Sequence, residues 1–310
     1  MRFKFPIHRK IKSFFVLSLA LFLGFGFALA QKTTKRITSP MPESLDERIK
    51  KEIAGFQGSV YIYAKNIDNG KTYELRADER VRTASTIKLP IMVEVFAQVA
   101  EGKLKWDEKF VLKNKISGSG ILGEFTEGTE LDLKTLVNLM IVVSDNTATN
   151  MILDRITTDA VNERMEKLGF QHIRSLRKIG GGGEAKIIDE GTNRLFGIGV
   201  ATMREMGRLL EMIERKEIIS KEACKEMIEI LRRQQYTDGL GRGLLETTPI
   251  ASKSGTLDRL RSDVGIIYTR KGRIVMAITV DDMPFVDYSF ENPGLKLIWR
   301  LSQILQEGLK

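Results

Sequence analysis

The sequence predicts an α+β fold: an α/β sandwich in which helices flank a five-stranded antiparallel sheet, plus an all-helical lobe. Three observations predict it. Strand-like segments lie near both ends of the chain, the segments between them have helical spacing, and an amphipathic helix closes the chain. A single sheet that pairs the N-terminal strands with the C-terminal ones is the most economical arrangement. The 310 residues suffice for one large domain or two fused lobes.

The first 30 residues have the pattern of an export signal. Five Lys and Arg side chains precede an apolar run over residues 14–30, which ends in Ala-Leu-Ala before Gln31. A basic region, an apolar region and small residues before a cut predict a cleaved signal peptide over residues 1–30. An uncleaved membrane anchor is the alternative. Two prolines indicate a linker over residues 31–42. We therefore expect a periplasmic or secreted protein whose folded domain is residues 43–310.

The strands and helices of that domain follow a β–helical–β order. A charged helix is predicted over residues 43–56, and the strands 59–67 and 71–75 flank an Asn69-Gly70 turn, a strong hairpin signal. Further strands are predicted over residues 251–255, 264–269 and 273–280, and the closing helix over residues 294–308. Helical spacing covers residues 85–100, 131–143, 146–156, 159–168, 201–213 and 221–234.

This order predicts two lobes within the domain. The sheet lobe would comprise residues 43–84 and 250–310, and the helical lobe about residues 85–249. Ligand sites favour the seam between such lobes.

The small number of cysteines and histidines limits the kinds of catalytic and metal site that this chain can form. Cys224 is the only cysteine, so no intrachain disulfide can form, and its helical surroundings predict a buried thiol. With His8 in the leader, His172 is alone in the rest of the chain, which excludes a zinc site built of several histidines. An acyl-transfer enzyme with this composition would use Lys or Glu as its base. We predict no metal and no organic cofactor.

The net charge favours a small substrate. The whole chain carries +9, but residues 1–30 hold five bases and no acid, so without them 44 bases face 40 acids, a net charge of +4. Such a mild excess gives weak support for nucleic-acid binding. We expect a small-molecule substrate, no nucleic acid, membrane contact only through an uncleaved leader, and a monomer.

Ser85-Thr86-Ile87-Lys88 opens the apolar run of the helix over residues 85–100. Because residues i and i+3 share a helix face, Lys88 can lie beside the Ser85 hydroxyl. A lysine whose pKa is lowered by burial and a second cation can take the proton of a serine nucleophile. An N-cap serine is the plain alternative. A second Ser-x-x-Lys, Ser175 to Lys178, has no apolar helix behind it and is interpreted as a chance match.

Ser144-Asp145-Asn146 lies between two predicted helices. Such residues ahead of a helix are ordinarily caps, and Asp145 fits that structural role. A hydroxyl and an amide at a helix junction can also reach one cleft. Ser144 could then pass a proton to a leaving nitrogen, and Asn146 could bind a substrate amide.

Lys253-Ser254-Gly255-Thr256 lies on a predicted strand near the C-terminus. The cation and the hydroxyls would hold a carboxylate, and Gly255 would let another backbone approach closely. The backbone N–H of Thr256 could complete an oxyanion hole with that of Ser85. The alternative is an exposed edge strand protected by a lysine.

The order and spacing of these three motifs resemble class A β-lactamases and penicillin-binding proteins. Residues 43–307 resemble such a β-lactamase/DD-peptidase-like domain throughout, and the extended match from Ser144 to Asn150 supports this. The resemblance implies a serine hydrolase that opens β-lactam rings, cyclic amides, through a covalent acyl-serine intermediate. It implies these roles: Ser85 as the acylated serine, Lys88 as its base, Ser144 as the proton relay, Asn146, Lys253, Ser254 and Thr256 as substrate-binding groups, and Asn150 as the holder of the deacylating glutamate.

The deacylating glutamate itself is the point at which this chain departs from the family. The corresponding loop contains four consecutive glycines and is longer than usual. Glu184 is the nearest candidate for the catalytic acid, and Asp189 and Glu190 are further options. With Glu184 misplaced, the acyl-enzyme would persist. The alternatives are therefore a D-Ala-D-Ala peptidase, penicillin-binding protein or esterase with slow deacylation, a non-enzymatic penicillin sensor, and an unrelated exported binding protein.

In this family an arginine after the third motif often helps to bind the substrate carboxylate. Arg259 and Arg261 lie near that place without aligning cleanly, and surface charges are the alternative interpretation.

Overall fold

A computed structural model describes residues 43–186 and 189–310, and residues 43–310 form one compact unit. The predicted signal peptide (1–30) and linker (31–42) lie outside the described residues. Within the described part, no helix combines the length and the apolar character needed to span a membrane.

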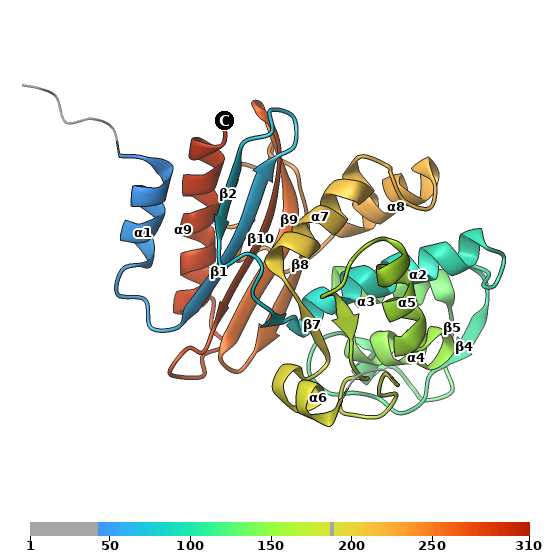
Figure 1. Cartoon of the computed structure of the whole chain (residues 1–310). Helices are drawn as coiled ribbons and strands as arrows, with labels where there is room; N and C mark the ends of the chain where they lie inside the picture. The colour runs from blue at the N-terminus through green and yellow to red at the C-terminus, as the bar shows by residue number, and fades with distance from the viewer. Residues whose placement is uncertain (1–42, 187–188) are drawn as a thin grey trace, which may run out of the picture. The chain divides into compact units, whose positions relative to one another are not determined.

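The central element is a five-stranded antiparallel sheet (Figure 1) with the strand order β2-β1-β10-β9-β8. Strand β1 pairs with β10 from Ser59 opposite Asp281 to Asn66 opposite Ile274, so the two ends of the domain meet in mid-sheet. The predicted α+β fold is confirmed. The strands are β1 (Ser59–Asn66), β2 (Thr72–Leu75), β8 (Ile250–Leu257), β9 (Leu260–Thr269) and β10 (Gly272–Asp281).

Helices cover both faces of the sheet (Figure 1). On one face lie α1 (Leu45–Ile53) and α9 (Pro293–Gly308), and on the other α7 (Met203–Glu214). Successive side chains of β1 point to opposite faces of the sheet and so contribute to two hydrophobic cores. Ile62 belongs to the core on the α9 side, and Tyr63 to the core on the α7 side. Gly207 lets α7 approach closely, because a Cβ there would lie 2.3 Å from a Tyr63 ring carbon.

The helical part is built around α2 (Lys88–Ala100), of whose thirteen residues eleven are buried. A helix that is apolar on nearly all sides belongs in the middle of a bundle. Its neighbours are α3 (Leu133–Val142), α4 (Asn146–Ile156), α5 (Thr158–Lys167) and α8 (Lys221–Leu231). The prediction of helices between the two β regions is confirmed.

Two details differ from the sequence prediction. The helix expected from residue 85 begins as a 3₁₀ turn, η1 (Ala84–Ile87), and α2 starts only at Lys88. Ala84 has a positive φ of 48°. A right-handed α-helix needs a negative φ, so it cannot include Ala84.

The sequence analysis also missed several short elements, because segments of two to seven residues carry too little periodicity to be recognised. They are β3 (Val81–Arg82), β4 (Lys109–Val111), η2 (Leu122–Glu124), β5 (Glu130–Asp132), β6 (Arg174–Ser175), α6 (Glu190–Phe196) and β7 (Gly199–Ala201).

Candidate active site

Residues of all three motifs line one cavity of about 590 Å³. The cavity lies where η1, the α3–α4 turn and the strands β8 and β9 meet, at the seam that the sequence predicts. Its wall includes Ser85, Ser144, Asn146, Ser254, Gly255, Thr256, Arg261, Asp263, Tyr236 and Tyr288. Lys88 and Lys253 are fully buried behind it.

Strand β8 runs directly against the turn that carries Ser85. A Cβ added at Gly255 would lie 2.9 Å from the Thr83 carbonyl oxygen, 3.1 Å from the Ala84 Cβ and 3.2 Å from the Ser85 nitrogen. Backbone atoms cannot yield to such a contact, so this position requires glycine. The predicted close approach of backbone at Gly255 is confirmed, and it brings the third motif to the serine.

The hydroxyl of Ser144 joins the lysines of the first and third motifs. The Lys88 Nζ lies 3.2 Å and the Lys253 Nζ 3.0 Å from the same Ser144 oxygen. Ser144 has a positive φ of 53°, a conformation that costs a non-glycine residue about 1–3 kcal/mol. The strained turn between α3 and α4 is thus what places this hydroxyl between the two amines.

Lys88 has the environment of a neutral amine. Burial, reinforced by the cation of Lys253, holds the pKa of Lys88 well below its usual range, while the carboxylate of Asp145 acts in the opposite direction. The Lys88 Nζ donates to the Ser144 carbonyl oxygen (2.7 Å) and to Asn146 Oδ1 (2.9 Å). Its Nζ also lies 3.2 Å from Ser144 Oγ. A neutral amine keeps one lone pair, so the lowered pKa lets Lys88 accept a hydroxyl proton at a lower pH than an ordinary lysine would.

Lys253 supplies the second cation. Its Nζ donates to Ser144 Oγ and to the Ser254 carbonyl oxygen (2.8 Å). Burial lowers the pKa of Lys253 to about 7, and the negative charge of Asp263 opposes that effect. Because two ammonium groups beside one oxygen repel each other, the cluster favours a state with one of them charged.

Asp145 and Asn146 play different parts at the start of α4. The Asp145 carboxylate accepts the backbone N–H groups of Ile121 and Leu122 at 2.7 and 2.9 Å, and that of Ala148 at 2.8 Å. Asp145 is therefore a structural residue that fixes the loop on the cavity's edge. The Asn146 side chain, between Lys88 and the Ser117 carbonyl oxygen (3.1 Å), lines the cavity.

Residues of the third motif form another part of the cavity wall. Ser254 and Thr256 line the cavity from β8. Of the two candidate arginines, Arg261 is buried on β9 and lines the same wall, whereas Arg259 is exposed. The interpretation of Arg261 as a surface charge is wrong, because its guanidinium packs over the Tyr288 ring and donates to three backbone carbonyl oxygens.

Glu184 lies apart from this cluster. It is exposed, accepts the Gly182 N–H at 2.9 Å, and lines a different cavity, beside α4 and α5, that shares no lining residue with the one at Ser85. Backbone hydrogen bonds lower the pKa of Glu184, which makes it a weaker base. Asp189 and Glu190, the further options, are also exposed, and neither lines the Ser85 cavity.

The residue that Asn150 holds is instead Ile179. The Asn150 amide donates to the Ile179 carbonyl oxygen (2.8 Å) and accepts the Ile179 N–H (3.0 Å). Asn150 lies one helical turn after Asn146 and shares its face of α4. The residue that Asn150 holds, which the resemblance implies to be a glutamate, is therefore an isoleucine in this chain.

Two features of this site escaped the sequence analysis. Asp263 and Ile179 belong to no motif, and their importance arises from contacts across distant parts of the chain. Asp263 directly precedes the predicted strand 264–269 and follows the polar residues Arg261 and Ser262, so no local pattern indicated its burial. No local pattern distinguishes Ile179.

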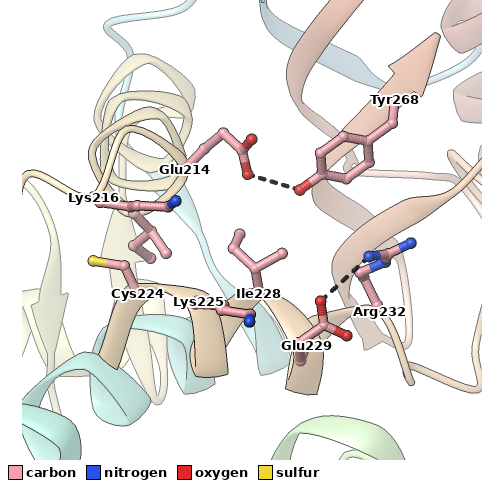
Figure 2. Close-up of a pocket in the computed structure, with 9 residues that line it drawn as sticks. Glu214, Lys216, Cys224, Lys225, Ile228, Glu229, Arg232 and Tyr268 are labelled. Atoms are coloured by element: carbon pink, nitrogen blue, oxygen red, sulfur yellow. Dashed lines mark hydrogen bonds and ion pairs between the residues drawn. The ribbon is translucent and has the colours of Figure 1, made fainter. Parts of the chain in front are cut away.

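A third cavity, of about 160 Å³, lies beside α7 and α8 and is lined in part by Cys224 (Figure 2). Figure 2 shows Tyr268 donating to Glu214 (2.7 Å) and Arg232 paired with Glu229. The predicted burial of Cys224 is confirmed, and burial raises the pKa of its thiol, so it is a poor nucleophile. In the described part of the chain, no cluster of His, Cys, Asp and Glu has the geometry of a metal site.

Comparison with known proteins agrees with this geometry. A family model described as the β-lactamase enzyme family matches residues 44–309. A β-lactamase of Bacillus licheniformis is 23% identical over 257 residues, which cover 82% of this chain and 80% of the relative. The VEB-1 β-lactamase of Pseudomonas aeruginosa is 22% identical over 279 residues, covering 86% of this chain and 88% of that protein.

Solved structures are similar over most of the domain. A β-lactamase from Sphaerobacter thermophilus superimposes with a TM-score of 0.74 at 28% identity, covering 86% of this chain and 96% of that one. A variant of PBP-A, solved as an acyl-enzyme complex with penicillin G, has a TM-score of 0.73 at 26% identity, covering 85% and 95% of the two chains.

Proposed function

The chain belongs to the β-lactamase enzyme family, and from that premise we propose that it is a serine hydrolase that opens β-lactams through a covalent acyl-serine at Ser85. One observation carries the proposal. Two buried lysines from distant parts of the chain share the Ser144 hydroxyl behind the cavity wall that contains Ser85. A cluster of this kind has no evident structural purpose, because burying two cations together is costly.

The acylation step follows from these positions. Ser85 Oγ attacks the lactam carbonyl carbon and gives its proton to neutral Lys88. When the tetrahedral intermediate collapses, the lactam C–N bond breaks and the nitrogen receives a proton through Ser144. Backbone N–H groups of Ser85 and Thr256 would stabilise the oxyanion, a contribution of about 10²–10³ in rate per donor.

The cavity wall suits an anionic substrate with an amide side chain. The amide of Asn146, which lines the cavity, would bind the side-chain amide of the substrate. The hydroxyls of Ser254 and Thr256, with the guanidinium of Arg261, offer hydrogen-bond donors to a carboxylate. Lys253 adds positive charge from behind this wall.

Deacylation is the step for which the chain is least equipped. The sequence candidate Glu184 lines another cavity, and Asn150 holds Ile179. A water molecule that attacks the acyl-enzyme without a positioned carboxylate loses a contribution of about 10²–10⁴ in rate. This observation supports the alternative function, in which a penicillin-binding protein or D-Ala-D-Ala peptidase forms an acyl-enzyme that is cleared slowly.

We also propose that the protein is exported, that its leader is removed before Gln31, and that it works as a monomer on a small molecule. The basic and apolar pattern of residues 1–30 supports export. N-terminal sequencing of the protein recovered outside the cytoplasm tests cleavage, and a sequence beginning at Met1 would contradict it.

Intact-protein mass spectrometry after exposure to penicillin G tests acylation. We expect an adduct of the full penicillin mass, mapped by peptide digestion to Ser85 and absent from the Ser85→Ala variant. A chromogenic cephalosporin assay on the same samples then measures turnover. A wild-type protein that shows neither adduct nor turnover contradicts the proposed function.

A further inference from the structure

Three aromatic side chains at the edge of the Ser85 cavity have no role in the proposed mechanism. Tyr236, Tyr288 and Phe290 are 42%, 65% and 71% exposed, and all three line this cavity. Large apolar side chains that gather beside a cavity, rather than scatter singly over the surface, are typical of a site for an apolar group. We call these three residues the aromatic rim.

Polar contacts hold the segment between β10 and α9, which carries two of these rings. Arg242, from the segment before β8, donates to the Phe290 carbonyl oxygen (2.7 Å) and pairs with Glu291 (3.0 Å). The Tyr288 hydroxyl donates to the Asp258 carboxylate in the β8–β9 turn. Because these contacts already order the segment, a ligand at the rim would not have to be compensated by much loss of chain entropy.

Arg261 relates the rim to the site at which we propose that the substrate carboxylate binds. Its guanidinium carbon lies 5.3 Å from the centre of the Tyr288 ring, and Nη2 donates to the Asp287 carbonyl oxygen. In the proposed function the same guanidinium, with Thr256, receives the carboxylate. Tyr288, and with it the segment that carries Phe290, therefore lies at the carboxylate end of the site.

The covalent structure of a β-lactam decides which part of the substrate can meet the rim. In a penicillin or cephalosporin, the second ring, fused at the lactam nitrogen, carries the carboxylate. The acylamino side chain is attached on the other side of the lactam carbonyl carbon. A substituent that reaches the rim while the carboxylate is at Arg261 must therefore belong to the carboxylate-bearing ring.

We propose that the aromatic rim is a subsite for a planar aromatic substituent on the carboxylate-bearing ring of the substrate. The inference rests on the proposed function and names the kind of β-lactam that the site prefers. Stacked or edge-to-face contact with an aromatic ring stabilises a complex beyond the burial of apolar surface alone. The aromatic substituent would leave with the lactam nitrogen's half of the molecule in a peptide substrate, but stays on the opened acyl-enzyme of a β-lactam.

Two cephalosporins test the proposal. They share one acylamino side chain and carry either a styryl or a methyl group on the ring carbon next to the one that bears the carboxylate. The rates of Ser85 acylation are measured by mass spectrometry, and the styryl-to-methyl ratio is compared between proteins, so that the intrinsic reactivity of each compound cancels. We expect this ratio to fall about 3- to 10-fold in Phe290→Ala. An unchanged ratio overturns the proposal.

Phe285→Ala is the matched control. Phe285 is an exposed phenylalanine of the same segment, but it does not line the cavity. Its substitution should leave the ratio at the wild-type value. An equal fall in both variants would attribute the effect to the segment as a whole and overturn the role of the rim.

A second pair of compounds tests which end of the substrate meets the rim. Two 3-methyl cephalosporins carry either a phenylacetyl or an acetyl group on the amino side chain. The rate ratio for this pair should be the same in wild type and in Phe290→Ala. A fall for this pair, with none for the styryl pair, would put the rim at the other end of the substrate and overturn the proposal.

Binding to the Ser85→Ala protein tests the rim without acylation. Calorimetry should give a lower Kd for the styryl compound than for the methyl compound, and the added Phe290→Ala substitution should remove the difference. Equal Kd values in Ser85→Ala overturn the proposal, as does a wild-type dimer, seen by sedimentation, that Phe290→Ala dissociates. A wild-type protein that forms no Ser85 adduct with any of these compounds would instead count against the proposed function.

Discussion

The Ile179→Glu substitution should convert a slowly cleared acyl-enzyme into a rapidly cleared one. Asn150 holds Ile179 through the backbone N–H and carbonyl oxygen only, at 3.0 and 2.8 Å. The side chain can therefore be exchanged without loss of either hydrogen bond. Asn150 shares a helix face with Asn146, which lines the Ser85 cavity. We therefore expect a carboxylate at residue 179 to reach a water molecule at the ester and activate it.

The expected size of this effect follows from general base catalysis, which contributes about 10²–10⁴ in rate. We expect the half-life of the penicillin G adduct to shorten at least about 100-fold. The adduct is formed with excess penicillin, the free drug is removed, and the surviving fraction is followed by intact-protein mass spectrometry. Rapid-mixing measurements of the acylation rate should show little change, because Ser85, Lys88 and Ser144 are untouched.

Ile179→Gln is the matched control, since glutamine has nearly the shape of glutamate without its basicity. Equal deacylation rates in the two variants would refute the reasoning, as would a wild-type protein that clears its adduct as fast as Ile179→Glu. In the second case another group activates the water. Glu184→Gln would then be the next variant to measure.

Three further substitutions test the packing and the proton path. Gly255→Ala should slow acylation and lower the free energy of unfolding by about 1–3 kcal/mol, because its Cβ would meet atoms of residues 83–85. Adduct formation measures the acylation rate, and denaturant unfolding measures the free energy. An unchanged acylation rate would contradict the close packing. Ser144→Ala should slow acylation about 10²-fold or more, because it removes the hydroxyl that the two lysines share. Thermal unfolding should stay cooperative. Acylation at the wild-type rate would exclude Ser144 as the proton relay. Asp145→Ala should lower the free energy of unfolding by at least about 2 kcal/mol, because three backbone N–H groups lose their acceptor. A change below about 0.5 kcal/mol would contradict this, because it would show that water replaces the carboxylate as acceptor.

Much of the fold is predictable from local pattern. The Asn69-Gly70 turn between two alternating segments fixes the first hairpin, and β1 and β2 pair as expected. The apolar character of α2 on nearly all sides predicts its central place. The 3₁₀ turn at Ser85 was not predictable, because it depends on the positive φ of Ala84 and on β8 packing against it.

In the candidate site, too, some features follow from local sequence motifs and others depend on the tertiary structure. The three motifs predict the convergence of Ser85, Lys88, Ser144 and Lys253, because short motifs fix residue types that tertiary structure then brings together. Whether a charged residue is exposed or buried depends on the whole fold. The sequence therefore left the burial of Arg261 open and did not indicate the burial of Asp263. The pairing of Asn150 with Ile179 joins a helix to a glycine-rich loop, and no local pattern determines where such a loop folds back.

The pH dependence of Ser85 acylation in the wild-type protein tests the central claim, that Lys88 is the neutral base of a two-lysine cluster. Burial and the Lys253 cation lower the pKa of Lys88 well below its usual range, so Lys88 accepts a proton at a lower pH than an ordinary lysine would. Lys253 loses its charge as the pH rises through about 7. We predict a rate of adduct formation that is greatest near neutral pH and falls on the alkaline side. A rate that keeps rising until pH 10 would identify an ordinary lysine and contradict the account.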